Sequence, residues 1–133
     1  MIGSLRGAVV ARTAEAEVIV EVGGVGYRVS VTTGTVAAVG AVGSAVFLHV
    51  HTHVREDAIV LYGFAHDDER RCFEALLGAH GVGPSLALAV LSALSPAALS
   101  TAVLEDDVET LCSVPGVGRK TAARLLIDLK SRL

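Results

Sequence analysis

Two short segments, Gly81-Val82-Gly83-Pro84 and Val114-Pro115-Gly116-Val117-Gly118-Arg119-Lys120-Thr121, share the core glycine-valine-glycine at an offset of 35 positions. At the same offset three further pairs of identical residues align: Leu76 with Leu111, Ala87 with Ala122 and Leu91 with Leu126. Apolar residues at helical spacing flank both copies, so the pattern predicts the unit helix, turn, helix twice over. The chain from about residue 65 onward is therefore expected to be all-α.

Each glycine-valine-glycine turn (G-V-G) also predicts a site for a phosphate-sized anion. Glycine lets the chain turn with an unusual φ and removes the side chain that would keep a ligand away from the backbone. The N–H groups at the start of the following helix point outward, with the helix dipole behind them. Val82 and Val117 are expected to point inward and fix the turns, while Arg119 and Lys120 add charge to the second copy.

Two other interpretations of these turns are open. They could be tight connections between helices that bind nothing, although two copies in matching contexts favour phosphate binding. They could also belong to a nucleotide-binding P-loop, which requires the pattern G-x-x-x-x-G-K-[ST]. Arg119 precedes Lys120-Thr121, and no glycine stands at the required place. We therefore expect that this chain does not hydrolyse ATP on its own.

The first 64 residues show a period of two, which is typical of β-strands. Alternating valines predict strands over residues 18–22 and 25–31. Gly23-Gly24 joins them, because a primed hairpin turn needs positive φ at its centre. Three more strands are expected over residues 2–10, 46–54 and 58–64, with a helical turn over residues 35–39. Five short strands in this length predict a small closed barrel.

Helices are expected from residue 67 onward, where Asp67 opens a run of three acidic residues that suits a first helical turn. Ser95 can cap a helix whose first residue is Pro96. Further helices are predicted after Pro84, over residues 108–112 and from residue 119 to the end.

The composition favours a folded, soluble protein. The chain has 133 residues, 52% of them hydrophobic and 19% charged, and 11 Lys/Arg against 14 Asp/Glu give a net charge of −3. This excludes bulk positive charge as the basis of nucleic-acid binding, but it allows local contacts through backbone amides and a few cations. The start of the chain lacks the pattern of a signal peptide. Glycine and proline interrupt the nearly uncharged residues 75–104, which argues against a membrane span.

The histidines and cysteines do not predict a metal site. His49, His51 and His53 share one strand face, but same-face neighbours are roughly 6.6 Å apart, so the outer two would be about 13 Å apart. A surface or interface face is the interpretation we favour, with contact to DNA or adventitious metal as the alternative. Cys72 and Cys112 have the spacing of neither a zinc ribbon nor a disulfide framework, which predicts a cytoplasmic protein.

Several motifs follow one another along the chain: Met1-Ile2-Gly3-Ser4-Leu5-Arg6-Gly7, Glu21-Val22-Gly23-Gly24-Val25-Gly26-Tyr27, Val54-Arg55-Glu56-Asp57-Ala58, Leu61-Tyr62-Gly63-Phe64, Gly81-Val82-Gly83-Pro84, Leu86-Ala87-Leu88 and Val114-Pro115-Gly116-Val117-Gly118-Arg119-Lys120-Thr121-Ala122. In this order and spacing they resemble the RuvA family of bacterial Holliday-junction-binding proteins. The resemblance covers the whole chain. It implies an OB-fold barrel over residues 1–64 and a tandem helix-hairpin-helix domain over residues 65–133. The family also has a third, motor-binding domain, which we expect to be absent from this sequence because it stops at Leu133. Two alternatives are open: the sequence is a truncated one, or this version has lost the contact with the motor.

The resemblance implies that hairpin amides contact the phosphates of the junction arms. The implied positions are Gly81, Gly83 and Ser85 in the first copy, and Gly116, Gly118 and Lys120 in the second. Ser85 is a departure, because a lysine would be unsurprising there. We therefore expect the first copy to hold its phosphate more weakly, through amides and a hydroxyl.

The resemblance further implies an acidic pin, formed by Glu56 and Asp57 at the tip of the hairpin between the last two barrel strands. Taken alone, two adjacent acids after Arg55 would be interpreted as a solvated loop. They are not a catalytic pair, since no nucleophile or cluster of metal ligands accompanies them in the local sequence. No catalytic residue, cofactor or metal is expected.

A RuvA-like chain is expected to bind four-way (Holliday) junctions structure-selectively, as a homotetramer or an octamer. It would hold them open for branch migration by the RuvB ATPase in DNA recombination, repair and the SOS response, with the RuvC resolvase as a further partner and no membrane. Two rival classes are a helix-hairpin-helix glycosylase, which needs a catalytic Asp and usually a Lys beyond the hairpin, and a protein-interaction module with vestigial turns. A gel shift of junction against linear duplex, with a glycosylase assay, separates the three.

Overall fold

The structure, a computed structural model, describes residues 1–133 and divides them into two units, Met1–Arg70 and Arg71–Leu133. The division falls inside helix α2 (Asp67–Leu77), whereas the sequence placed the domain boundary between residues 64 and 65. The helix that contains the division therefore begins in one unit and ends in the other.

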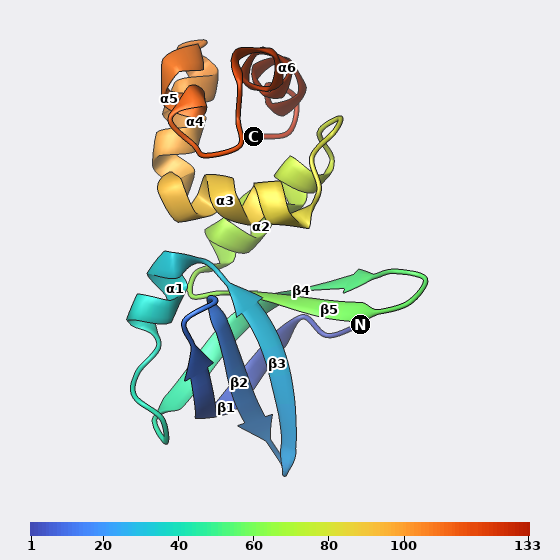
Figure 1. Cartoon of the computed structure of the whole chain (residues 1–133), viewed down its shortest axis with the longest axis vertical. Helices are drawn as coiled ribbons and strands as arrows, with labels where there is room; N and C mark the ends of the chain where they lie inside the picture. The colour runs from blue at the N-terminus through green and yellow to red at the C-terminus, as the bar shows by residue number, and fades with distance from the viewer. The chain divides into compact units, whose positions relative to one another are not determined.

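The first unit is a closed barrel of five strands (Figure 1). In chain order the strands are β1 (Ser4–Thr13), β2 (Glu17–Val22), β3 (Val25–Val31), β4 (Ala45–Val54) and β5 (Ile59–Phe64), with the short helix α1 (Thr33–Ala38) between β3 and β4. Their order around the barrel is β1-β2-β3-β5-β4, and neighbours are antiparallel except for β3 and β5, which are parallel. The predicted five-stranded, OB-like barrel is confirmed.

Alternating valines fill this barrel. Val18 and Val20 of β2 are fully buried and Val29 of β3 is too, while the residues between them along each strand are more exposed. Gly23 and Gly24 connect β2 to β3 with φ values of +57° and +86°, as the primed hairpin turn requires. The period of two in the sequence therefore corresponds to the two faces of the barrel wall.

The first strand differs from the expected residues 2–10. Thr52 of β4 accepts the N–H of Ile2 at 3.1 Å and donates its hydroxyl to the Ile2 carbonyl at 2.7 Å. A side chain therefore satisfies the backbone groups of Ile2, and β1 begins only at Ser4. At its other end β1 continues to Thr13, because Thr13 still pairs with Glu17 of β2.

The second unit is all-α and contains the end of α2 together with α3 (Pro84–Ala93), α4 (Pro96–Leu104), α5 (Val108–Cys112) and α6 (Arg119–Leu129). The predicted cap is present, since the Ser95 side chain accepts the N–H of Ala98 at 3.1 Å. No single helix is long and apolar enough to cross a membrane. Only α3 and α4 taken together meet these criteria, and they meet at a bend of 95°.

Candidate nucleic-acid interface

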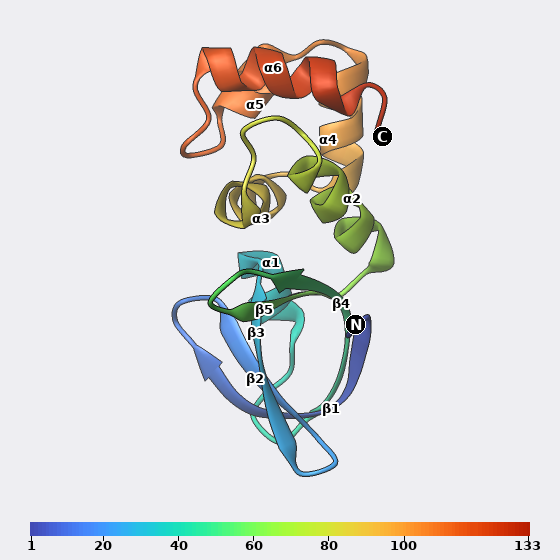
Figure 2. The ribbon, with the colours of Figure 1, turned by 90° about the vertical axis from the view of Figure 1, so that its right-hand side faces the viewer.

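Two helical hairpins in the second unit repeat the same backbone. The first hairpin is α2, residues 78–83 and α3; the second is α5, residues 113–118 and α6 (Figure 2). Equivalent turn hydrogen bonds occur in both: Ala79 N–H to Leu76 O at 3.0 Å and Val114 N–H to Leu111 O at 3.2 Å, then Val82 N–H to Ala79 O at 3.3 Å and Val117 N–H to Val114 O at 3.0 Å. The repeat predicted from the sequence is therefore a repeat of hydrogen bonding as well as of residues.

The two glycines of each turn have different conformations. Gly81 and Gly116 have φ values of +77° and +91°, which favour glycine, as predicted. The same prediction is wrong for Gly83 and Gly118, whose φ values of −96° and −90° suit any residue. A Cβ atom on Gly83 or Gly118 would meet nothing within 4 Å. Neither strain nor packing within this chain requires glycine at these two positions, and the backbone there is open to a ligand.

The valine between each pair of glycines points into the unit, as predicted. Val82 is 9% exposed and Val117 is 6% exposed, so both side chains belong to the core rather than to the surface. Any contact that these two residues make with a ligand must therefore come from the backbone. Their burial anchors the turn beneath the open glycines.

The turns lead directly into helix N-termini. Gly83 and Gly118 are the N-cap residues of α3 and α6, and neither helix has a side-chain cap. The first N–H groups of each helix therefore have no intrahelical or capping partner and suit an anion. Pro84 is the first residue of α3 and has no N–H, so α6, which begins with Arg119, offers one donor more.

The charge around the two hairpins is unequal. Lys120 at the start of α6 is exposed and has no ion-pair partner in the structure, and Ser85 stands at the equivalent place in α3. Arg119 is paired with Glu109 of α5, and both side chains are about three-quarters exposed. Lys120 is therefore the uncompensated cation of the second hairpin, while Arg119 is partly neutralised.

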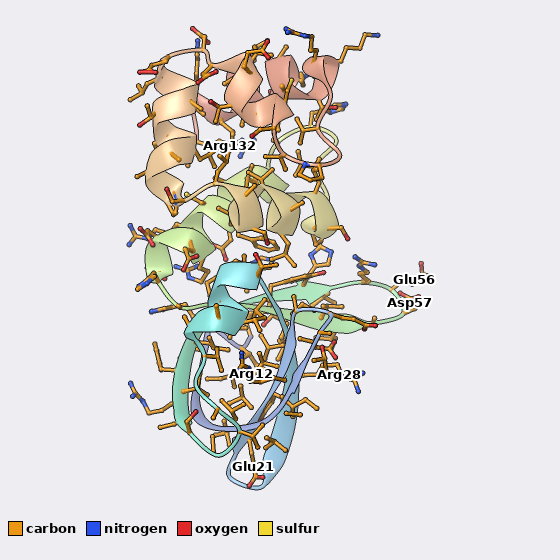
Figure 3. All side chains as sticks on the ribbon, turned by 60° about the vertical axis from the view of Figure 1, so that its left-hand side comes forward. Arg12, Glu21, Arg28, Glu56, Asp57 and Arg132 are labelled. Atoms are coloured by element: carbon orange, nitrogen blue, oxygen red, sulfur yellow. The ribbon has the colours of Figure 1, made fainter.

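The end of α6 contacts the first hairpin, a feature that the sequence did not reveal. The carboxylate of Asp128 accepts the N–H of His80 at 2.9 Å. The guanidinium of Arg132, labelled in Figure 3, lies so close to Gly78 that a Cβ atom there would collide with it. In the sequence Asp128 has only the spacing of a surface partner for Arg124, with which it also forms a 3.8 Å ion pair.

The first helix of the second hairpin, α5, has an acidic N-cap. Asp107 accepts the backbone N–H of Thr110 at 3.1 Å and its hydroxyl at 2.6 Å. These two hydrogen bonds, the side-chain one first, hold the pKa of Asp107 below its ordinary value of 3.8. Only five residues make up α5, so this cap contributes much of what fixes the start of the hairpin.

Glu56 and Asp57 lie at the tip of the β4–β5 hairpin, as Figure 3 shows. The N–H of Arg55 donates to the carbonyl oxygen of Ala58 at 2.8 Å and closes the turn beneath them. Both acids are exposed, and no hydrogen bond or ion pair engages either carboxylate. Their charge therefore points into solvent from the far end of a protruding ribbon.

The three histidines of β4 are half-buried, and they alternate with buried Leu48 and Val50. His49 Nδ1 lies 3.6 Å from a carboxylate oxygen of Asp67. Across residues 1–133 no group of three or more His, Cys, Asp or Glu side chains is placed to hold a metal ion.

Family models match both parts of the chain. The family described as RuvA N terminal domain matches residues 1–63, which form the barrel. The family described as SAM-like Helix-hairpin-helix tandem matches residues 73–131, which contain both hairpins.

Curated relatives align with nearly the whole chain. The protein of Acidothermus cellulolyticus is 50% identical over 133 residues, 100% of this chain and 67% of the relative. That of Symbiobacterium thermophilum is 49% identical over 134 residues, 100% and 64%, and that of Herpetosiphon aurantiacus is 45% identical over 132 residues, 99% and 66%. Each is called Holliday junction branch migration complex subunit RuvA. The chain thus spans about two thirds of the length of the curated relatives it matches.

Proposed function

Since this chain belongs to the RuvA family, we propose that it binds four-way DNA junctions and holds them open for branch migration. The observation that carries the proposal is the pair of equivalent G-V-G hairpins, each with an open glycine at a helix N-terminus. A duplex arm presents phosphates from two strands, and two such sites in one unit suit that arrangement.

The grip on DNA is proposed to come mainly from backbone amides. The implied donors are the residues of the two turns and of the first helical turn after each: Gly81, Val82, Gly83 and Ser85 in the first hairpin, and Gly116, Val117, Gly118, Arg119 and Lys120 in the second. Amides cannot read base sequence from a phosphate, so binding should depend on the shape of the DNA and on salt rather than on its sequence. The net charge of −3 is compatible with this mode, because the cations are local.

The acidic tip of the β4–β5 hairpin is proposed to act by repulsion. Glu56 and Asp57 are solvated and unpaired, so they incur no burial cost, and they repel any phosphate that approaches them. If several copies of the chain surround one junction, these acids discourage a continuous duplex from crossing the centre and direct separated strands into the arms. Discrimination then comes from an unfavourable contact with the wrong DNA.

The chain itself is proposed to be non-catalytic. The assembly that we propose is a homotetramer or an octamer, with ATP hydrolysis supplied by a RuvB-type motor and later cleavage by a RuvC-type resolvase, in the cytoplasm. No residue of this chain is proposed to take part in chemistry, with or without a cofactor.

The decisive experiment is a gel shift of the 133-residue chain with a four-way junction and with linear duplex of the same sequence, over a range of salt. We expect tighter binding to the junction, with affinity falling steeply as salt rises. Equal affinity for both DNAs would contradict junction selectivity. Binding that does not change with salt would contradict the phosphate grip.

A further inference from the structure

The two hairpins reach the same backbone shape with different residues at one position. His80 of the first hairpin occupies the place that Pro115 has in the second, at the repeat offset of 35. Proline fixes φ through its ring and has no N–H to satisfy. Histidine does neither, so the first hairpin needs a second device to hold its turn and a partner for the amide of His80.

Asp128 supplies that device from a position 48 residues further along the chain. Its carboxylate accepts the His80 N–H at 2.9 Å, and a hydrogen bond to an ionised acceptor is about twice as strong as a neutral one. Arg132, three residues after the end of α6, adds a contact, because its guanidinium lies against Gly78. Helix α6 therefore follows the turn of the second hairpin at its N-terminal end and contacts the first hairpin near its C-terminal end.

We propose that Asp128 is a positioning residue for DNA: it holds the first hairpin so that the amides after Gly81 face a phosphate, and it touches no DNA itself. Its negative charge excludes a direct role in binding phosphate. Because α6 is a rigid rod, about 16 Å long at 1.5 Å per residue, the same helix also fixes the spacing between the two sites. The inference rests on the proposed function of the hairpins.

The test is a cycle of two substitutions in the full chain, Asp128→Ala and His80→Pro, measured by junction affinity at several salt concentrations. Asp128→Ala is expected to weaken junction binding roughly tenfold at each salt concentration, because the amides of the first hairpin no longer face a phosphate. The slope of log affinity against log salt should stay as in the wild type, since neutral amides release no counterions. His80→Pro is expected to bind like the wild type. The sign of φ at His80 is compatible with proline, since only Ala16 and Asp106 have positive φ outside glycine, and Pro115 stands at the equivalent place of the second hairpin. In the His80→Pro background, Asp128→Ala should then cost nothing.

Two further variants separate positioning from general stability. Asp128→Asn retains an oxygen that can accept the His80 N–H, so it is expected to keep a junction affinity close to that of the wild type. Asp106→Asn removes the 2.6 Å ion pair with Lys130 near the same end of α6 without touching a hairpin, so it is expected to bind like the wild type. Circular dichroism and a thermal melt of every variant measure folding and stability separately from junction affinity.

Each outcome tests either the positioning role of Asp128 or the proposed function of the chain. A wild-type chain that binds junctions, with Asp128→Ala equal to it in affinity, would overturn the positioning role. The role would also be overturned if the double variant stayed as weak as Asp128→Ala while His80→Pro alone bound normally. If His80→Pro fails to fold, Asp128→Asn decides: a junction affinity as low as that of Asp128→Ala overturns the role. A wild-type chain without salt-dependent junction binding would instead contradict the proposed function.

Discussion

The first and second hairpins of the helical unit have the same turn hydrogen bonds, positive φ at the same glycine and a buried valine at the same place, but their charges differ. The second begins its helix with Arg119 and Lys120, and the first with Pro84 and Ser85. The two hairpins thus share their backbone geometry but not their charge. If both hairpins bind phosphate, the second should bind it more tightly, and the first should contribute mainly to the orientation of the DNA.

The largest expected effect comes from Gly118→Asp. The backbone at Gly118 suits any residue and is an N-cap, where aspartate is favoured over glycine by a few tenths of a kcal/mol, so thermal stability should hold or rise. The new carboxylate would occupy the phosphate site, and junction affinity should fall roughly 100-fold, or about 2.7 kcal/mol. Titration of junction DNA together with a thermal melt measures both.

The matched variant Gly83→Asp makes the same change in the first hairpin, where a loss of only about tenfold is expected. Gly118→Ser, which caps without charge, serves as the control and should lose much less than Gly118→Asp. Equal losses for the two aspartate variants would show that the hairpins contribute equally, against the asymmetry argued above.

Exchanging Lys120 and Ser85 between the two hairpins should also exchange the affinities of the hairpins for phosphate. Lys120→Ser is expected to weaken junction binding about fivefold and to lower the salt slope by about one, whereas Ser85→Lys should do the reverse. The double exchange should return close to wild type, since both side chains occupy the second position of their helix. If Ser85→Lys leaves the slope unchanged, no phosphate lies at the first hairpin.

The acidic tip of the β4–β5 hairpin has the opposite charge to the second hairpin and should have the opposite effect on DNA. Replacing both Glu56 and Asp57 by lysine is expected to raise affinity for linear duplex about threefold and to reduce the preference for the junction. The control, Glu15→Lys with Glu21→Lys, changes the net charge equally at exposed positions elsewhere on the barrel. An identical response of the two double variants would mean that only net charge matters.

The smallest effect expected concerns acid. Asp107, which caps α5 at the start of the second hairpin, has a lowered pKa, so its stabilising effect is fully present above 3.8 and is lost as pH falls through the lowered value. The difference in thermal stability between wild type and Asp107→Ala should therefore be constant near neutral pH and shrink below 3.8. Amide exchange at acid pH should therefore rise in residues 113–118, the turn that follows the five-residue helix α5. A difference between the two proteins that persists at pH 2 would contradict the role of this carboxylate.

Features determined by nearby residues were predictable from the sequence. The barrel strands follow from alternating valines and the Gly23-Gly24 turn, and the hairpins follow from the glycine repeat. What the sequence could not distinguish is glycine needed for positive φ, as at Gly81, from glycine that leaves the backbone open, as at Gly83. The two kinds of glycine cannot be told apart in the sequence, and only their backbone φ angles distinguish them.

Features that depend on distant residues were not predictable. The start of β1 was misplaced because Thr52, 50 positions away, takes over the hydrogen bonds of Ile2. Asp128 was overlooked for the same reason, since its bond to His80 spans 48 positions. Its sequence spacing indicates only an ordinary surface pair with Arg124. The binding roles of the hairpin residues and of Glu56 and Asp57 remain predictions, for which the gel shift and its variants are the test.

Closure of the barrel has a consequence for how the chain folds. It requires β1 to pair with β4, as in Ser4 with His49, and β3 to pair in parallel with β5, as in Val29 with Leu61. The backbone–backbone hydrogen bonds within either helical turn, in contrast, join residues only three or four positions apart. The long loops between these strands must lose conformational entropy before the strands can pair and stabilise the barrel. The high contact order of the barrel therefore predicts that it folds slowly. During synthesis on a ribosome the barrel cannot close until β5 has emerged. Until then, the strands made earlier keep an unpaired edge.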